Sequence, residues 1–174
     1  MIISLQDIPK EGLSLSYLES SEKFGFPRSS FPDPISISLY LSRDGDEILA
    51  EGRVVARELL QCSRCLAEAT NLIEAQFMTA YAPLTQAPRE EEVQLRREDL
   101  DVIFYQDDSI ELSELITGQI LLARPMRPLC KPECLGLCQA CGQDLNLRAC
   151  GCSPEVYHSP FSALIQVKRA LEDR

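Results

Sequence analysis

The sequence predicts an α+β protein: a mostly antiparallel β-sheet with one internal helix, a cysteine-rich zinc-binding segment and a C-terminal helix. Three observations predict it. Apolar residues alternate strictly with polar ones between residues 35 and 57, and they repeat at three and four between residues 111 and 123. Six of the eight cysteines lie within 23 residues. A chain of 174 residues with 45% hydrophobic residues can bury a core of its own, so the cysteines need a separate explanation.

The strands are predicted from period-two patterns, which place one face of a strand on a core. In the first strand Ile35, Ile37, Leu39 and Leu41 share a face, and Asp44-Gly45 indicates a hairpin turn after it. A second strand runs from about residue 48 to 57, with its small and apolar residues at even positions. A third runs from about 72 to 81, and a short one covers 101–105. The pair Cys62 and Cys65 therefore lies in a connection between two strands.

Helical spacing appears in two places. We expect a helix at about 111–123, ended by Pro125, because the residue before a proline avoids the helical region. Ser159-Pro160 predicts the start of a last helix, with an apolar face through Leu164 and Leu171. We expect residues 1–128 to form the sheet domain, with an acidic loop at 83–99. Residues 129–174 would form the zinc-binding segment and C-terminal helix, packed on the first domain through a shared zinc site.

The first residues carry no basic stretch and no long apolar run, and no segment approaches the ~18 apolar residues that span a bilayer. We therefore expect a cytoplasmic protein without membrane contact. Thiols stay reduced in the cytosol, so eight cysteines there indicate metal ligands rather than disulfides.

Charge is distributed unevenly. The net charge is −10; residues 1–123 carry 10 Lys/Arg and 22 Asp/Glu, whereas residues 124–174 carry 7 and 5. An acidic body repels phosphate backbones, which argues against broad RNA coating and favours a basic protein partner. An alternative to a basic partner stays open: the acidic charge can serve only to keep the chain in solution. Four basic residues near the cysteines are candidates for facing RNA, although they also suit a solvated surface: Arg124, Arg127, Lys131 and Arg148.

Cysteine spacing predicts two four-cysteine zinc sites, since eight thiolates fill two tetrahedral sites without remainder. Cys138 and Cys141 form a knuckle followed by Gly142, and Cys150 with Cys152 is their natural mate. The second site would then hold the remaining four: Cys62, Cys65, Cys130 and Cys134. Two other pairings stay open. Cys130 and Cys134 could join the local cluster, or all eight sulfurs could be interleaved between the ions.

The same ligands predict a structural role for zinc, because four-cysteine sites have no open position for a substrate. The sequence contains one histidine, His158, which argues against a catalytic triad and against a histidine-based metal site, and it contains no Gly-rich phosphate loop. We therefore expect no enzymatic activity and no small-molecule substrate. The alternatives are a zinc- or thiol-carrying protein that delivers metal to a client, and a redox protein using Cys62-x2-Cys65.

Three segments together resemble the YceD-type large-ribosomal-RNA accumulation proteins: residues 62–66, residues 110–130, and residues 134–146 with Gly136-Leu137 and Leu145-Asn146. The resemblance runs in order over nearly the whole chain. It implies a bacterial or plastid protein that supports accumulation of large-subunit (23S) ribosomal RNA, with no established enzymatic activity. It also implies a partner in the pre-ribosomal particle, such as a small basic large-subunit ribosomal protein, with ribosomal RNA as a candidate contact.

Overall fold

The structure is a computed structural model that describes residues 1–88, 94 and 101–152. Contacts divide the chain into two compact units. The first unit contains residues 1–62 and 67–130, and the second contains residues 63–66 and the chain from Lys131 onward. The predicted C-terminal helix with His158, and the acidic run at 90–92, lie outside the described residues.

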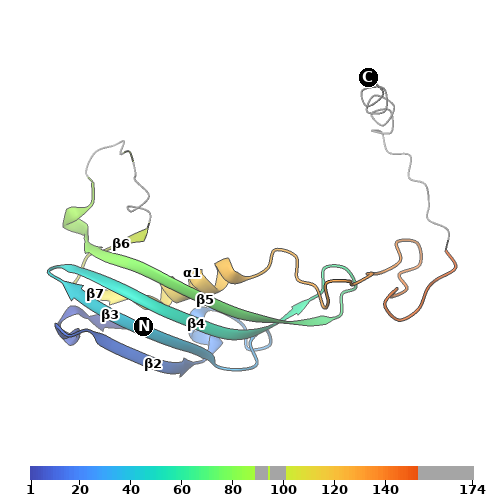
Figure 1. Ribbon diagram of the computed structural model, residues 1–174, viewed down its shortest axis with the longest axis horizontal. Helices are drawn as coiled ribbons and strands as arrows, with labels where there is room; N and C mark the ends of the chain where they lie inside the picture. Colours follow the sequence, from blue (N-terminus) through green and yellow to red (C-terminus); the bar gives the residue numbers. More distant parts are fainter. Residues whose placement is uncertain (89–93, 95–100, 153–174) are drawn as a thin grey trace, which may run out of the picture. The chain divides into compact units, whose positions relative to one another are not determined.

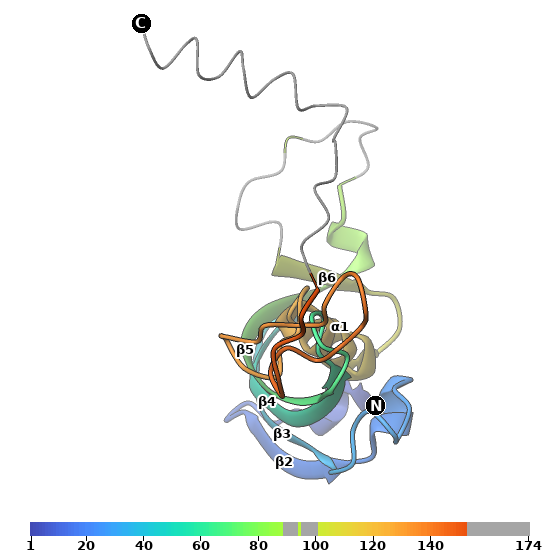
Figure 2. The ribbon, with the colours of Figure 1, turned by 90° about the vertical axis from the view of Figure 1, so that its right-hand side faces the viewer.

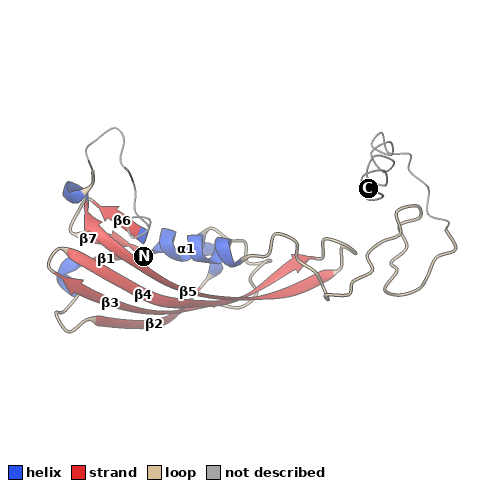
Figure 3. Ribbon diagram, turned by 45° about the horizontal axis from the view of Figure 1, so that its top comes forward, coloured by secondary structure: helices blue, strands red, loops and turns tan. Residues whose placement is uncertain are grey.

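The first unit is built on a five-stranded sheet in the order β2-β3-β4-β5-β6 (Figures 1 and 3). The strands are β2 (Leu13–Glu19), β3 (Ile35–Asp44), β4 (Glu47–Gln61), β5 (Glu68–Pro83) and β6 (Val102–Tyr105). Neighbours from β2 to β5 are antiparallel, whereas β6 runs parallel to β5. A small second sheet pairs β1 (Ile2–Ser4) with β7 (Ser109–Glu111), and 3-10 turns occur at Leu5–Asp7, Ser21–Phe24 and Leu84–Gln86.

One α-helix, α1 (Leu112–Ala123), occurs in the described ranges, and it lies along one face of the sheet, whose strands curve around it (Figure 2). Its buried residues repeat at three and four, as the sequence predicts: Leu112, Leu115, Ile116 and Ile120. No helix in the part of the chain that the structure describes is long and apolar enough to cross a membrane.

The core lies between α1 and the inward rows of β3, β4 and β5. All four residues predicted to face inward from β3 are buried, as are Ile48, Ala50, Val54 and Ala56 of β4. Gly52 belongs to the same row. A Cβ atom there would lie 2.6 Å from both Leu39 and Phe77, so a larger residue cannot occupy this position without moving the core.

The predicted elements of this unit are largely confirmed. The hairpin turn at Asp44-Gly45 joins β3 to β4, and Gly45 has a positive φ of 64°, as a tight hairpin turn requires. The strand predicted at 48–57 extends to Gln61, and the one predicted at 72–81 covers Glu68–Pro83. The chain is therefore mixed α+β with mostly strands. Three further strands were not predicted: β1, β2 and β7.

Candidate metal centre

The structure brings the eight cysteines into two groups of four. The first group is Cys62, Cys65, Cys130 and Cys134, and the second is Cys138, Cys141, Cys150 and Cys152. Within each group all four Sγ atoms lie within 4.8 Å of one another. This grouping agrees with the partition that the spacing favours. Metal binding by these thiolates stays a prediction.

The first group begins where the long β4–β5 hairpin turns. β4 ends at Gln61 and β5 begins at Glu68, so Cys62 and Cys65 lie in the connection. The Cys62 N–H donates to the Ala67 carbonyl at 2.8 Å, which closes the turn that carries both cysteines. Cys62, Cys65 and Cys134 are buried, whereas Cys130 is exposed. Thiols held away from water in this way suit a closed, structural metal site.

Arg64, which lies between the two cysteines of the hairpin turn, was not predicted as a site residue. Its Nη1 donates to the Cys134 carbonyl at 2.8 Å, and its own carbonyl accepts from the Leu137 N–H at 3.1 Å. Gly136 packs against the same residue: an added Cβ would lie 3.0 Å from the Arg64 carbonyl oxygen, and the φ of Gly136 is +76°. Both the space and the backbone conformation therefore require glycine at position 136.

The second group is a local knuckle. Gly142 N–H donates to the Cys138 carbonyl at 2.9 Å, and Cys138 N–H donates to the Gln143 carbonyl at 2.8 Å. These bonds turn the chain between Cys138 and Cys141 so that both sulfurs face one point. Gly142 has φ +72°, the left-handed conformation that follows such a turn. Cys138 and Cys150 are half-buried, and Cys141 and Cys152 are exposed.

Within the second group, the surroundings favour the thiolate form at Cys138. The backbone N–H of Cys141, then the Cys150 side chain and the backbone N–H of Ala140, lower the pKa of Cys138 to about 6. The opposite holds for Cys152, where the side chains of Cys141 and Cys150 raise the pKa to about 12. Neighbouring thiolates repel one another, and a bound cation would offset that repulsion. Metal binding would therefore displace protons from this group.

Both groups fit a tetrahedral metal ion. Zn–S bonds of ~2.3 Å place the four sulfurs of a tetrahedral site roughly 3.8 Å apart, within the 4.8 Å spread of each group. All candidate ligands are thiols, which as thiolates select soft or borderline metals rather than Mg²⁺ or Ca²⁺. Four such donors would fill a tetrahedral coordination sphere, so an ion held there would serve to hold the chain.

The four candidate RNA-facing residues differ in their surroundings. Arg124, directly after α1, has Nη2 at 2.6 Å from Oε1 of Glu58, whose side chain is 0% exposed. Arg148 donates from Nε to Oε1 of Gln143 at 3.0 Å. Arg127 and Lys131 are exposed. Arg124 and Arg127 belong to the first unit and the other two to the second, so no single described unit carries all four. Their contact with RNA stays a prediction.

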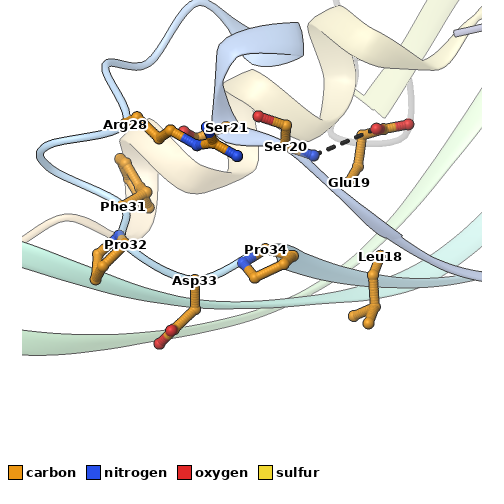
Figure 4. A pocket seen from close by; sticks show the side chains of 9 residues that line it. All are labelled: Leu18, Glu19, Ser20, Ser21, Arg28, Phe31, Pro32, Asp33 and Pro34. Atoms are coloured by element: carbon orange, nitrogen blue, oxygen red, sulfur yellow. Dashed lines mark hydrogen bonds between the residues drawn. The ribbon is translucent and has the colours of Figure 1, made fainter.

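A pocket of about 160 Å³ lies elsewhere in the first unit, beside the end of β2 (Figure 4). Its walls combine apolar residues such as Phe31 and Pro34 with Arg28 and Ser21. Sites for small molecules usually have ~300–1,000 Å³. None of the eight cysteines lines this pocket, so it is separate from both cysteine groups.

Comparison with known proteins gives one family. Residues 50–168 match the family model described as "Large ribosomal RNA subunit accumulation protein YceD". The match covers more than half of the chain and includes all eight cysteines.

Individual relatives share between a quarter and a third of their aligned residues with this chain. An uncharacterized protein of Mycobacterium tuberculosis is 27% identical over 111 residues, which are 64% of this chain and 51% of the relative. A Zea mays protein named "Large ribosomal RNA subunit accumulation protein YCED homolog 1, chloroplastic" is 28% identical over 152 residues, 70% of this chain and 49% of the relative. The chain thus spans about half the length of these curated relatives. No solved structure matches it.

Proposed function

Because the chain belongs to the YceD family of large ribosomal RNA subunit accumulation proteins, we propose that it supports the accumulation of large-subunit ribosomal RNA as a non-catalytic binding protein. The observation that carries this proposal is the pair of four-cysteine groups within the family match. Sites of this kind stabilise a fold and leave no coordination position for a substrate. We place its action in the cytoplasm, where thiols remain reduced.

Zinc is the metal that best suits both groups. In proteins generally, structural zinc is bound by four thiolates in a closed tetrahedral site, and the ion holds together segments that are separate in the sequence. We propose two zinc ions per chain, both structural. Elemental analysis of the purified full chain should give a zinc-to-protein ratio near two. A ratio near one would contradict the two-site assignment, and a metal-free protein with oxidised cysteines would contradict zinc binding altogether.

The proposed partner is a basic large-subunit ribosomal protein or the pre-ribosomal particle that contains it. Residues 1–123 carry 22 acidic against 10 basic side chains, which attracts a basic surface and repels bare RNA. Binding of a basic ribosomal protein should therefore weaken as salt rises. Replacing Glu90, Glu91 and Glu92 with Gln should slow association. The basic ribosomal protein and ribosomal RNA fragments can each be titrated into this chain at several salt concentrations. The two sets of affinities compare the candidate partners directly.

The test of the cellular role is depletion of the protein in its host. Large-subunit ribosomal RNA should fall relative to small-subunit RNA on a sucrose gradient, and the wild-type gene should restore it. A Cys62→Ser variant should fail to restore it, whereas a Gln139→Ala variant, changed at an exposed position inside the second knuckle, should succeed. Unchanged ratios of the two RNAs after depletion would contradict the proposed role.

Metal delivery is the second candidate, and the exposure of Cys141 and Cys152 favours it, because a client can reach those sulfurs. Pulse-labelling with zinc-65 and transfer to a chelator at competing concentration distinguishes the two. A structural ion should stay bound for hours, and a delivered ion should leave within minutes. The redox alternative gains no support from the placement of its motif: Cys62 and Cys65 join two antiparallel strands, whereas redox-active pairs start a helix after a parallel strand.

A further inference from the structure

Asn146 lies in the loop between Cys141 and Cys150 of the second group, yet it contacts a cysteine of the first. Its Nδ2 donates to the Sγ atom of Cys134 at 3.4 Å. Its Oδ1 accepts from the Leu135 N–H at 3.0 Å, so the same side chain binds two consecutive residues at that cysteine. Cys134 itself is 2% exposed, which makes this contact hard for water to replace.

Asp144 fixes the direction of the Asn146 amide. Its Oδ1 accepts from the Asn146 N–H at 2.8 Å and from Nδ2 at 2.7 Å. Nδ2 therefore donates one hydrogen to a carboxylate and one to a sulfur, and Oδ1 accepts from a backbone N–H. With the amide reversed, its oxygen would face a carboxylate and its NH₂ would face another donor. The surroundings thus select the orientation that gives the thiol a donor.

The backbone that carries Asn146 lies between two cysteines of the second group. The loop leaves at Cys141 and returns at Cys150, so both of its ends are ligand positions of one group. Leu145 N–H donates to the Gly136 carbonyl at 3.0 Å, and Leu137 and Asp144 form an isolated β-bridge. A metal bound by the second group would close this loop, reduce the conformations available to residues 142–149 and so favour the position of Asn146 beside Cys134.

We infer that Asn146 is a positioning residue that couples the two metal sites: metal in the second group raises the affinity of the first for its own ion. A donor to a ligating thiolate stabilises its deprotonated, metal-binding form, and such contacts change metal affinity ~10–100-fold. By thermodynamic linkage, metal in the first group raises the affinity of the second by the same factor. The inference rests on the metal binding proposed above, and it adds an order and a mechanism to it.

The experiment is a cadmium titration of the full chain, followed by cadmium-113 NMR, which gives each site its own resonance, with competition against a chelator for affinity. Asn146→Ala should weaken the first site about 10-fold or more. Leu147→Ala is the matched control, since that neighbouring side chain is 81% exposed, and it should leave both affinities unchanged. Should Asn146→Ala fail to fold, Asp144→Ala, which removes the acceptor that orients the amide, should show a smaller loss of the same sign.

A double-mutant cycle isolates the coupling. Cys138→Ser with Cys141→Ser removes the second site and should also weaken the first about 10-fold. Adding Asn146→Ala to that variant should then cost little more, because the loop no longer holds the amide in place. Full additivity of the two losses, or a first site indifferent to the second, would overturn the inference while leaving metal binding intact. A chain that takes up no cadmium would instead contradict the proposed metal binding.

Discussion

The two cysteine groups use the same ligands but close very different lengths of chain. Sixty-four residues separate Cys65 from Cys130 in the first group, whereas eight separate Cys141 from Cys150 in the second. An eightfold longer loop is three doublings, worth roughly 2 kcal/mol more restriction of the unfolded chain. Burial differs in the same direction, with three of four cysteines buried in the first group and none in the second. We therefore expect the first group to stabilise the whole fold and the second group to stabilise mainly its own loop, although both groups consist of four cysteines.

Removing one ligand from each group is the strongest test of this difference. Cys62→Ser should lower the free energy of unfolding by roughly 2 kcal/mol more than Cys150→Ser does, because only the first closes the long loop. Denaturant unfolding of the zinc-loaded variants measures this. Hydrogen exchange should show lost protection throughout Cys62→Ser but mainly at residues 138–152 in Cys150→Ser. Equal losses of protection throughout both variants would show that the two groups do not differ in what they stabilise.

The ion pair between the buried Glu58 and the half-buried Arg124 tests how much stability near the first group comes from charge rather than from metal. Glu58 lies on β4, four residues before Cys62, and neither of its oxygens has a well-aligned hydrogen bond. Losing Arg124 would leave a buried carboxylate without its partner, which costs ~3–5 kcal/mol when both groups are buried. Since the Arg124 side chain is 35% exposed, we expect Arg124→Ala to cost about 2–3 kcal/mol in thermal or denaturant unfolding.

Two variants sharpen that measurement. Arg127→Ala, at an exposed position three residues later, should change stability by less than ~0.5 kcal/mol. Adding Glu58→Gln to Arg124→Ala should recover part of the loss, because the buried charge is then gone. A loss in Arg124→Ala that disappears once zinc is chelated would assign the effect to the metal site instead.

Gly136 packs against Arg64, and both residues belong to the second unit. Replacing Gly136 should give the next largest loss of stability. Alanine there must adopt φ +76° and approach the Arg64 carbonyl to 3.0 Å. We expect Gly136→Ala to cost ~1–2 kcal/mol. Gly118 in α1 is the matched control. It has no atom within 4 Å of an added Cβ, so Gly118→Ala should stabilise the helix by ~0.5–1 kcal/mol. If both substitutions changed the free energy of unfolding in the same direction, the argument from backbone geometry would be contradicted.

The sequence predicted those parts of the fold in which periodicity dominates. The alternation in β3 and β4 and the spacing in α1 reflect faces that must be buried, and a turn residue such as Gly45 marks the boundary. The three-residue strands β1 and β7 carry too few positions for a period to show. The parallel pairing of β6 with β5 depends on how the chain returns, which no single strand records. β2 alternates too, with Leu13, Leu15 and Tyr17 on its half-buried face, so its pattern was available in the sequence.

For the candidate site, spacing was sufficient to favour the partition of cysteines, because short gaps keep paired sulfurs together. It was insufficient for the residues that support them. Arg64 and Asn146 reach Cys134 through loops whose path depends on tertiary bonds. Glu58 shares the parity of Val54 and Ala56, so it faces inward once β4 continues past residue 57. Ending that strand at 57 hid a buried carboxylate that period two would have revealed.

The smallest predicted effect concerns the residue that follows each Cys-x2-Cys pair. Both positions are left-handed, with φ 62° at Leu66 and 72° at Gly142, but only the second is glycine. The left-handed conformation costs a leucine ~1–2 kcal/mol, and glycine loses ~0.5–1 kcal/mol more backbone entropy on folding. Leu66→Gly should therefore stabilise the protein by about 0.5 kcal/mol, whereas Gly142→Ala should destabilise it by ~1 kcal/mol.

Differential scanning calorimetry of the zinc-loaded proteins can resolve these opposite shifts in melting temperature. The Leu66 side chain is 59% exposed, so its removal sacrifices little apolar contact within the chain. A destabilisation of more than ~1 kcal/mol in Leu66→Gly would mean that packing of this leucine outweighs its backbone strain. Unchanged stability combined with weaker binding of the proposed ribosomal partner would have a different meaning: the strained leucine is retained for contact with that partner, and the turn that carries Cys62 and Cys65 serves recognition as well as folding.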